Sequence, residues 1–182
     1  MPIYSHSKIE TFEQCKQKYK LKYIDKIPVL EKSIEAFLGS MVHETLEWLY
    51  RQVKQEKLPN IDETIIHYIT SWEENYTPEV YIVKQGLKNS DYFNMGITFI
   101  LNYYTKHHPF NDNTLETEKR IYINLDESGE NKLMGIIDRL VHNTENDEIE
   151  IHDYKTSSAM PTKEKLDNDR QLALYSIAIK EQ

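Results

Sequence analysis

The chain has 182 residues, a formal net charge of −8 and a single cysteine. This length suits one domain with a substantial core, and no apolar run approaches the roughly 20 residues that span a bilayer. The acidic charge argues against a nucleic-acid binder, while the lone cysteine excludes an intrachain disulfide and, with no signal-peptide pattern at the start, predicts a cytoplasmic protein without a membrane partner.

Helical spacing of apolar residues dominates the first part of the sequence. It predicts helices over residues 5–25, 33–57, 61–75 and 90–107. In the first of them Ser7 is a candidate N-cap, with Glu10 three residues later, and we expect a break around Cys15. The same segment is locally basic, with five lysines and one aspartate over residues 16–26. The acidic net charge is therefore unevenly distributed and does not exclude a nucleic-acid partner.

After Pro109 the pattern changes to alternating residues rich in isoleucine and tyrosine. It predicts strands over residues 115–125, 133–142 and 148–154, with turns between them. Residues 161–169 lead into a last helix. The order of helices, a three-stranded meander and a helix predicts an α+β fold. We expect a single domain over residues 1–182, with a helical insertion over about 58–110.

Two aspartates stand in the predicted strands. If Asp153 and Lys155 both lie in a strand, they are two positions apart and point to the same face. There the carboxylate can hold a divalent cation, and the ammonium can orient a water molecule. A surface ion pair is the simpler alternative. Asp138 sits among apolar residues and needs a cation or hydrogen bonds, which Arg139 on the opposite face is poorly placed to supply. Adjacent strands would bring the two carboxylates together around a cation.

Helical residues supply further candidates. His43 lies in the clearest predicted helix, four residues after Gly39, and either packs at the core edge or acts as a ligand. Glu47 stands where a zinc-protease helix has its second histidine, which weakens that alternative. Gln171 and Tyr175 share one face of the last helix, where they either pack on the sheet or hydrogen-bond a phosphate or a site carboxylate.

Four short motifs occur in one order along the chain: Gly39-x-x-x-His43, Gly135-Ile-Ile-Asp138, Asp153-Tyr-Lys155 and Gln171-x-x-x-Tyr175. With these motifs, and an opening from Tyr4 to Tyr19 that is also similar, the sequence resembles the RecB-like branch of the PD-(D/E)XK nuclease superfamily. That branch includes the nuclease domains of RecB and AddAB and the CRISPR-associated Cas4-type exonucleases. The resemblance covers nearly the whole chain and implies a restriction-endonuclease-like α/β/α core with a central mixed sheet.

The resemblance also implies a role for each motif. The ligands of a Mg²⁺ or Mn²⁺ ion would be His43, Asp138, Asp153 and the backbone carbonyl of Tyr154. Lys155 would position the attacking water and stabilise charge at the scissile phosphate. Gln171 and Tyr175 would support the site or hold the DNA strand.

Many members of this branch bind an iron–sulfur cluster through one cysteine near the N-terminus and three near the C-terminus. Cys15 matches the first position, but the other three are absent from the sequence. Four thiolates are the usual requirement, so we expect no cluster in this 182-residue chain. Either the chain has lost its C-terminal region and Cys15 is a remnant of the cluster site, or the chain is a cluster-free relative in which Cys15 only packs. The cysteine-bearing C-terminal region is the part of the family pattern that we expect to be missing.

The function that the resemblance implies is a metal-dependent DNA nuclease. It would be an exonuclease of repair, recombination or defence that acts on single strands or duplex ends, beside a helicase or another subunit. Two alternatives stay open. One is an inactive DNA-binding or scaffold member of the same fold. The other is a metal hydrolase of small phosphate substrates, although the sequence has neither a phosphate-binding glycine loop nor a histidine-rich metal site.

Overall fold

The computed structural model describes residues 3–29, 31–157 and 161–180. The chain divides into two compact units, one of residues 1–29, 118–137 and 159–182, and one of residues 30–117 and 138–158. The borders fall inside two long strands, β4 (Thr114–Asn124) and β5 (Lys132–Asn143). Each of these strands therefore contributes to both units. That the whole chain acts as one domain stays a prediction.

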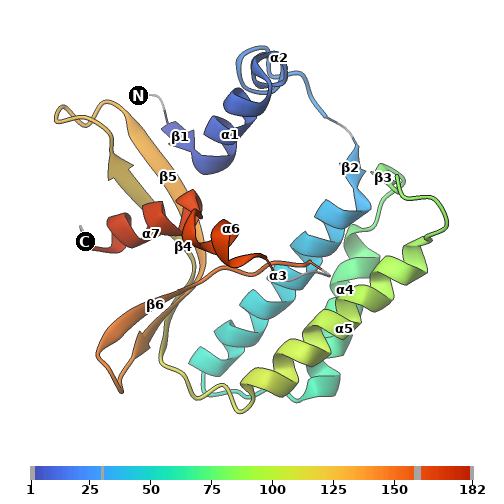
Figure 1. The fold of residues 1–182 in the computed structure, drawn as a ribbon. Coiled ribbons are helices and arrows are strands. Elements are labelled where there is room, and N and C mark those ends of the chain that lie inside the picture. Colours follow the sequence, from blue (N-terminus) through green and yellow to red (C-terminus); the bar gives the residue numbers. More distant parts are fainter. Residues whose placement is uncertain (1–2, 30, 158–160, 181–182) are drawn as a thin grey trace. The chain divides into compact units, whose positions relative to one another are not determined.

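Three helices form the body of the second unit: α3 (Ile34–Lys54), α4 (Ile61–Asn75) and α5 (Asn89–His107). They lie side by side and contact one another in every pair (Figure 1). All three were predicted from apolar spacing, and α4 has the predicted bounds. Its start is fixed by a capping box, in which Asn60 and Glu63 each accept the other's backbone N–H. The predicted insertion over about 58–110 contains α4, α5 and a short strand, β3 (Val80–Tyr81), which pairs in parallel with β2 (Lys32–Ser33).

Burial of apolar side chains between these helices makes the main core of the second unit. Its buried members are Ile34, Phe37, Leu38, Met41, Val42, Leu46, Tyr68, Trp72, Val80, Tyr92 and Ile100. Gly96 lets α5 approach α4 closely, because a Cβ atom on Gly96 would lie only 2.0 Å from the hydroxyl oxygen of Tyr68. The core therefore fixes α3 rigidly, and α3 is the helix that carries His43.

Strand β5 has hydrogen-bonded neighbours of both directions. In the second unit it pairs antiparallel with β6 (Glu148–His152), with Arg139 opposite His152. In the first unit it pairs in parallel with β1 (Ile3–Ser5), and β4 is its other neighbour in the described sheet. The predicted α+β class, mixed sheet and meander are confirmed. However, β6 ends two residues earlier than predicted, so Asp153 follows the strand instead of lying in it.

The first unit carries the remaining helices. They are α1 (His6–Gln14), α2 (Lys16–Tyr19), the π-helix η1 (Lys20–Ile24), α6 (Lys163–Asp167) and α7 (Arg170–Lys180). The predicted break at Cys15 is confirmed, since its extended backbone separates α1 from α2. The predicted N-cap was wrong: Ser5, not Ser7, accepts the N–H of Lys8, because the helix begins directly where β1 ends.

Helix α7 packs on β5 within this unit. Tyr175 is 6% exposed, and its ring covers Gly135, where a Cβ atom would lie 2.4 Å from Cε1 of the tyrosine. In the described part of the chain, no helix combines the length and apolar character needed to cross a membrane.

Candidate active site

Three elements of the second unit bring His43, Asp138 and Tyr154 together. His43 projects from α3, Asp138 from β5, and Tyr154 from the segment that follows β6. Nδ1 of His43 lies 3.4 Å from Oδ1 of Asp138, and the backbone N–H of Tyr154 donates to Oδ2 of Asp138 at 2.6 Å. The backbone of Tyr154 also hydrogen-bonds the His43 ring. His43, Asp138 and Tyr154 therefore form a local cluster in which each residue contacts the other two.

Asp153 and Lys155 form a second pair at the same place. Nζ of Lys155 forms an ion pair with Oδ2 of Asp153. The lysine side chain is 58% exposed and the carboxylate 10% exposed, so the ammonium reaches in from solvent toward a nearly buried acid. The predicted shared strand face is wrong, because Asp153 and Lys155 both lie beyond the end of β6. Their contact exists nevertheless, through the conformation of the segment after the strand.

Gly39 explains how closely α3 approaches that segment. A Cβ atom at position 39 would lie 3.2 Å from Oγ1 of Thr156, which is tighter than ordinary van der Waals contact. One helical turn later, His43 faces Asp138 and Tyr154. The glycine of the Gly39-x-x-x-His43 motif therefore has a steric role, and the histidine contacts Asp138 and Tyr154.

The electrostatics of the cluster reflect two acids confined near one histidine. Burial raises the pKa of Asp153, Lys155 lowers it, and the charge of Asp138 raises it, with a net rise. Burial lowers the pKa of His43, but its hydrogen bond and attraction to Asp138 outweigh burial, so the net change is upward. The rise in the pKa of His43 reflects the negative charge beside it, whereas the rise in the pKa of Asp153 comes mainly from burial.

The donor set suits a hard divalent cation. Two carboxylates and a backbone carbonyl are oxygen ligands of the kind that Mg²⁺ and Mn²⁺ prefer, and one imidazole is compatible with Mn²⁺. The mutual repulsion of Asp138 and Asp153 is what a bound cation would relieve. Among the described residues, no three His, Cys, Asp or Glu side chains are already grouped as a metal site. Here Asp153 is engaged by Lys155 and Asp138 by Tyr154.

A buried arginine beneath the cluster was not predicted. Arg139 is fully buried, with its guanidinium 4.0 Å from the ring centre of Tyr50. It forms an ion pair with Asp112 and donates to Thr114 at 3.1 Å, and it contacts Nδ1 of His152 at 3.0 Å. The expectation that Arg139 does not pair with Asp138 fits these contacts. Arg139 directly follows Asp138, and His152 directly precedes Asp153. This network therefore fixes the backbone that carries both aspartates.

The first unit holds the remaining predicted residues. On α7, Nε2 of Gln171 donates to the hydroxyl of Tyr175 at 2.7 Å, so these two form the expected helical pair. Their role toward the catalytic residues stays a prediction. Cys15 is exposed, and its Sγ accepts the N–H of Lys18 at 3.4 Å, which makes it the N-cap of α2. That contact gives the cysteine a structural function, while a cluster-related role is untested.

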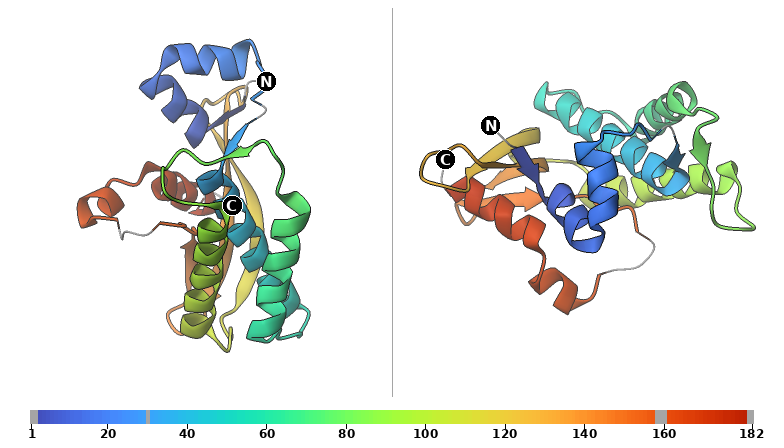
Figure 2. Two further views of the ribbon diagram at one scale, coloured as in Figure 1. Left: turned by 90° about the vertical axis from the view of Figure 1, so that its right-hand side faces the viewer. Right: turned by 90° about the horizontal axis from the view of Figure 1, so that it is seen from above.

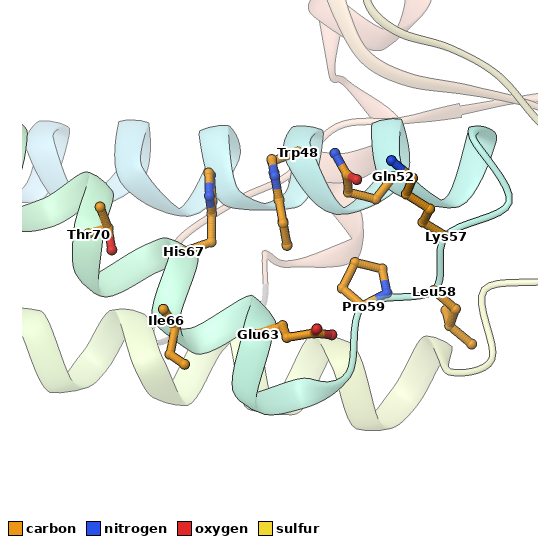
Figure 3. A pocket seen from close by; sticks show the side chains of 9 residues that line it. All are labelled: Trp48, Gln52, Lys57, Leu58, Pro59, Glu63, Ile66, His67 and Thr70. Atoms are coloured by element: carbon orange, nitrogen blue, oxygen red, sulfur yellow. The ribbon is translucent and has the colours of Figure 1, made fainter.

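A separate groove of about 560 Å³ lies between α3 and α4, and Figure 3 shows the side chains that line it. Trp48 and His67 stack in it with their ring centres 4.2 Å apart. Glu44 pairs with Nε2 of His67 at 2.9 Å and accepts from Ser71 at 2.8 Å. Glu44 follows His43 directly in sequence, but its carboxylate contacts His67 and Ser71 and so joins α3 to α4.

Comparison with known families assigns the chain. The family model of the PD-(D/E)XK nuclease superfamily matches residues 3–182, which include every motif named above. No curated protein matches the chain significantly. The superfamily comprises phosphodiester-hydrolysing nucleases that generally use divalent metals, typically Mg²⁺ or Mn²⁺. The helices and mixed sheet are consistent with its restriction-endonuclease-like fold. This chain therefore belongs to the PD-(D/E)XK nuclease superfamily.

Proposed function

We propose that this chain is a Mg²⁺- or Mn²⁺-dependent deoxyribonuclease whose site consists of His43, Asp138, Asp153, Lys155 and the carbonyl of Tyr154. The observation that carries the proposal is the meeting of α3, β5 and the segment after β6 at these residues within one unit. Asp138 and Asp153, with His43 and the Tyr154 carbonyl, would hold the cation. When bound, the cation would lower the pKa of a water molecule and neutralise charge on the phosphate.

Lys155 has a distinct part in this proposal. An ammonium group cannot ligate a cation, because it has no lone pair. Its exposed side chain can move from Asp153 to a phosphate oxygen or to the attacking water, where it would stabilise the negative charge that develops. Asp153 has the complementary task of keeping the ammonium at the site before substrate arrives. The pair therefore separates cation binding from charge stabilisation.

His43 and Tyr154 would orient the acids. The N–H of Tyr154 fixes one oxygen of Asp138, which leaves the other oxygen on the side of His43. The rings of His43 and Tyr154 meet edge to face with centres 5.6 Å apart, so the imidazole has a defined plane. Orientation of this kind matters because phosphodiester hydrolysis requires the water and the leaving oxygen to be in line.

A cleavage assay tests the proposal. Labelled single-stranded DNA and duplex DNA are incubated with the protein and Mn²⁺, with EDTA as the blank. We expect cleavage by the parent and loss of at least 100-fold for Asp153→Asn, the scale of removing a catalytic group. Asp147→Asn is the matched control, because Asp147 is an exposed carboxylate that pairs with His142 on the nearby hairpin. Equal cleavage by both variants would contradict the site.

The finer parts of the proposal rest on the resemblance. They are exonuclease activity, a pathway of DNA repair, recombination or defence, a cytoplasmic location, and a helicase or other subunit as partner. A circular DNA substrate distinguishes an exonuclease, which requires an end, from an endonuclease. Binding of DNA without cleavage in Mn²⁺ would favour the inactive DNA-binding alternative. Hydrolysis of only a small phosphodiester would favour a metal hydrolase of small phosphate substrates.

A further inference from the structure

The N-terminal segment of the first unit presents aromatic and apolar side chains to solvent. Over residues 3–29 no described residue is buried, although α1, α2 and η1 contain several large apolar residues. Phe12 is 45% exposed and Ile24 is 62% exposed. A helical segment that leaves its aromatic side open to solvent offers a surface to a partner. We call it the basic aromatic surface, formed by Tyr4, Lys8, Phe12, Lys16, Tyr19, Lys22 and Tyr23.

The rings of this surface form a continuous row. Phe12 and Tyr19 meet edge to face with ring centres 5.2 Å apart, and Tyr19 and Tyr23 are also 5.2 Å apart. The row passes across the break at Cys15, where the chain turns from α1 into α2 (Figure 2). It ends in the π-helix η1, a rare form that often marks functional positions. Rings from α1, α2 and η1 are thereby brought onto one surface.

Lysines accompany the rings. Nζ of Lys16 lies 5.7 Å from the ring centre of Phe12, and Nζ of Lys22 lies 5.2 Å from that of Tyr23. Lys8 lies between Tyr4 and Tyr23, at 5.2 and 5.6 Å from their ring centres. Exposed cation–π contacts are weak, and a nucleobase stacked on a ring is worth more. A lysine can therefore yield its ring face to a base and turn to the adjacent phosphate.

Charge on this segment is opposite to that of the chain. Residues 8–26 contain six lysines and three acids, whereas the whole chain has a net charge of −8. Two of the acids are already paired: Glu13 binds Arg170 through both carboxylate oxygens at 3.0 and 2.6 Å, and Asp25 lies 3.8 Å from Lys20. The positive charge of the remaining lysines is therefore available to an anion.

The surface is anchored to the helix that carries two predicted site residues. The Glu13–Arg170 pair joins α1 to α7, and Arg170 is followed directly by Gln171. His6 at the start of α1 lines a small cavity together with Tyr175 of α7. Within the first unit, α1, which carries part of the basic aromatic surface, therefore contacts α7, which carries Gln171 and Tyr175.

We propose that the basic aromatic surface binds single-stranded DNA, with bases stacked on its rings and phosphates held by its lysines. The proposal rests on the proposed function in taking DNA as the substrate. Alternating rings and lysines match the chemistry of a single strand, whose bases are free to stack and whose phosphates follow at each step. A duplex offers only phosphates, since its bases are already stacked, so we expect weaker binding of duplex DNA.

Binding is measured without catalysis, by fluorescence anisotropy of a labelled 20-nucleotide oligo(dT) in EDTA. Phe12→Ala and Tyr23→Ala should each weaken binding about 5- to 100-fold, the scale of losing one base–ring stack. Phe12→Trp should retain it. Lys16→Gln/Lys22→Gln should lower the slope of log affinity against log salt by about 1.4, since each phosphate contact on a single strand contributes about 0.7.

The matched control is Lys84→Gln/Lys106→Gln, which removes two exposed lysines of the second unit and should leave affinity and slope nearly unchanged. Circular dichroism confirms that each variant keeps its helices. An equal loss of oligo(dT) affinity in the two double lysine variants would show nonspecific charge attraction and overturn the proposal. So would parental binding by Phe12→Ala and Tyr23→Ala, or binding of anionic phospholipid vesicles but not of oligo(dT). If the unmodified protein bound oligo(dT) but did not cleave DNA in Mn²⁺, the result would contradict the proposed function and leave the binding surface standing.

Discussion

Replacement of Arg139 by methionine tests whether the buried guanidinium stabilises the second unit. Methionine keeps an unbranched side chain of similar length in the space beside Tyr50, so packing is largely preserved. The substitution removes the ion pair with Asp112, the hydrogen bond to Thr114 and the contact with His152. Its effect therefore reports mainly on the charge and its partners.

The expected size follows from these contacts. A hydrogen bond to a charged group contributes about 1.5–3 kcal/mol, and a desolvated cation–π contact about 2 kcal/mol. Relief of the desolvation of the buried guanidinium offsets part of this loss. Asp112 is 31% exposed, so water can solvate it once the arginine is gone. We expect Arg139→Met to lower the free energy of unfolding by about 2–3 kcal/mol, which most domains tolerate.

Asp112→Asn should cost more, about 3–5 kcal/mol, because it leaves a buried cation without its anion. The double variant Arg139→Met/Asp112→Asn should cost less than the two single changes together, since no buried charge is left unpaired. Urea denaturation followed by tryptophan fluorescence measures all three. Trp48 and Trp72, the two tryptophans of the chain, both lie in the second unit, so the signal reports on that unit. Additive effects, or a loss below about 1 kcal/mol for Arg139→Met, would refute the reasoning.

Three further predictions concern single residues. Lys155→Ala should keep Mn²⁺ affinity within a few-fold of the parent or raise it, while cleavage falls by about two to four orders of magnitude; titration calorimetry beside a nuclease assay checks both. Gly96→Ala should destabilise by about 1–3 kcal/mol in urea, because the new methyl group overlaps the buried Tyr68 hydroxyl; unchanged stability would contradict that contact. Burial and the charge of Arg139 lower the pKa of His107, so the unfolded chain takes up a proton first as pH falls below about 6.5. Stability from this group is present above that pH and lost below it, and His107→Gln should flatten the fall in Tm between pH 7.5 and 5.5.

Local patterns predicted the secondary structure of this chain well. Helix α4 has the predicted bounds and α5 begins one residue early, because apolar spacing and caps are properties of short segments. The short strands β1, β2 and β3 were not predicted, and the errors in bounds lie where one element runs directly into another. The start of α1 was misplaced because β1 places Ser5 at the cap position. Strand β6 was predicted too long because its pairing with β5 stops at Arg139 opposite His152, where the N–H of Tyr154 donates to the side chain of Asp138.

The candidate site residues were chosen from their chemistry more than from geometry, and their roles stay predictions. His43, Asp138, Asp153 and Lys155 were named because their types and order matched a nuclease pattern, and the described contacts place them in one cluster. Arg139 was missed because its partners come from other segments: Tyr50 lies on α3 and Asp112 in the loop before β4. A charged residue inside an apolar strand was the available signal, but nothing in the sequence says which distant side chain will neutralise it.

The division of β4 and β5 between two units has a consequence for synthesis of the chain. Strand β1 is translated long before its partner, the segment around Lys132, which lies opposite Ile3. Helices α3, α4 and α5 need only one another and can assemble while that partner is still being translated, at roughly 5–20 residues per second. Strand β1 therefore stays unpaired until residues 132–134 have been translated. A chaperone that bound nascent residues 3–29 would act on them for several seconds longer than on the helices that follow them.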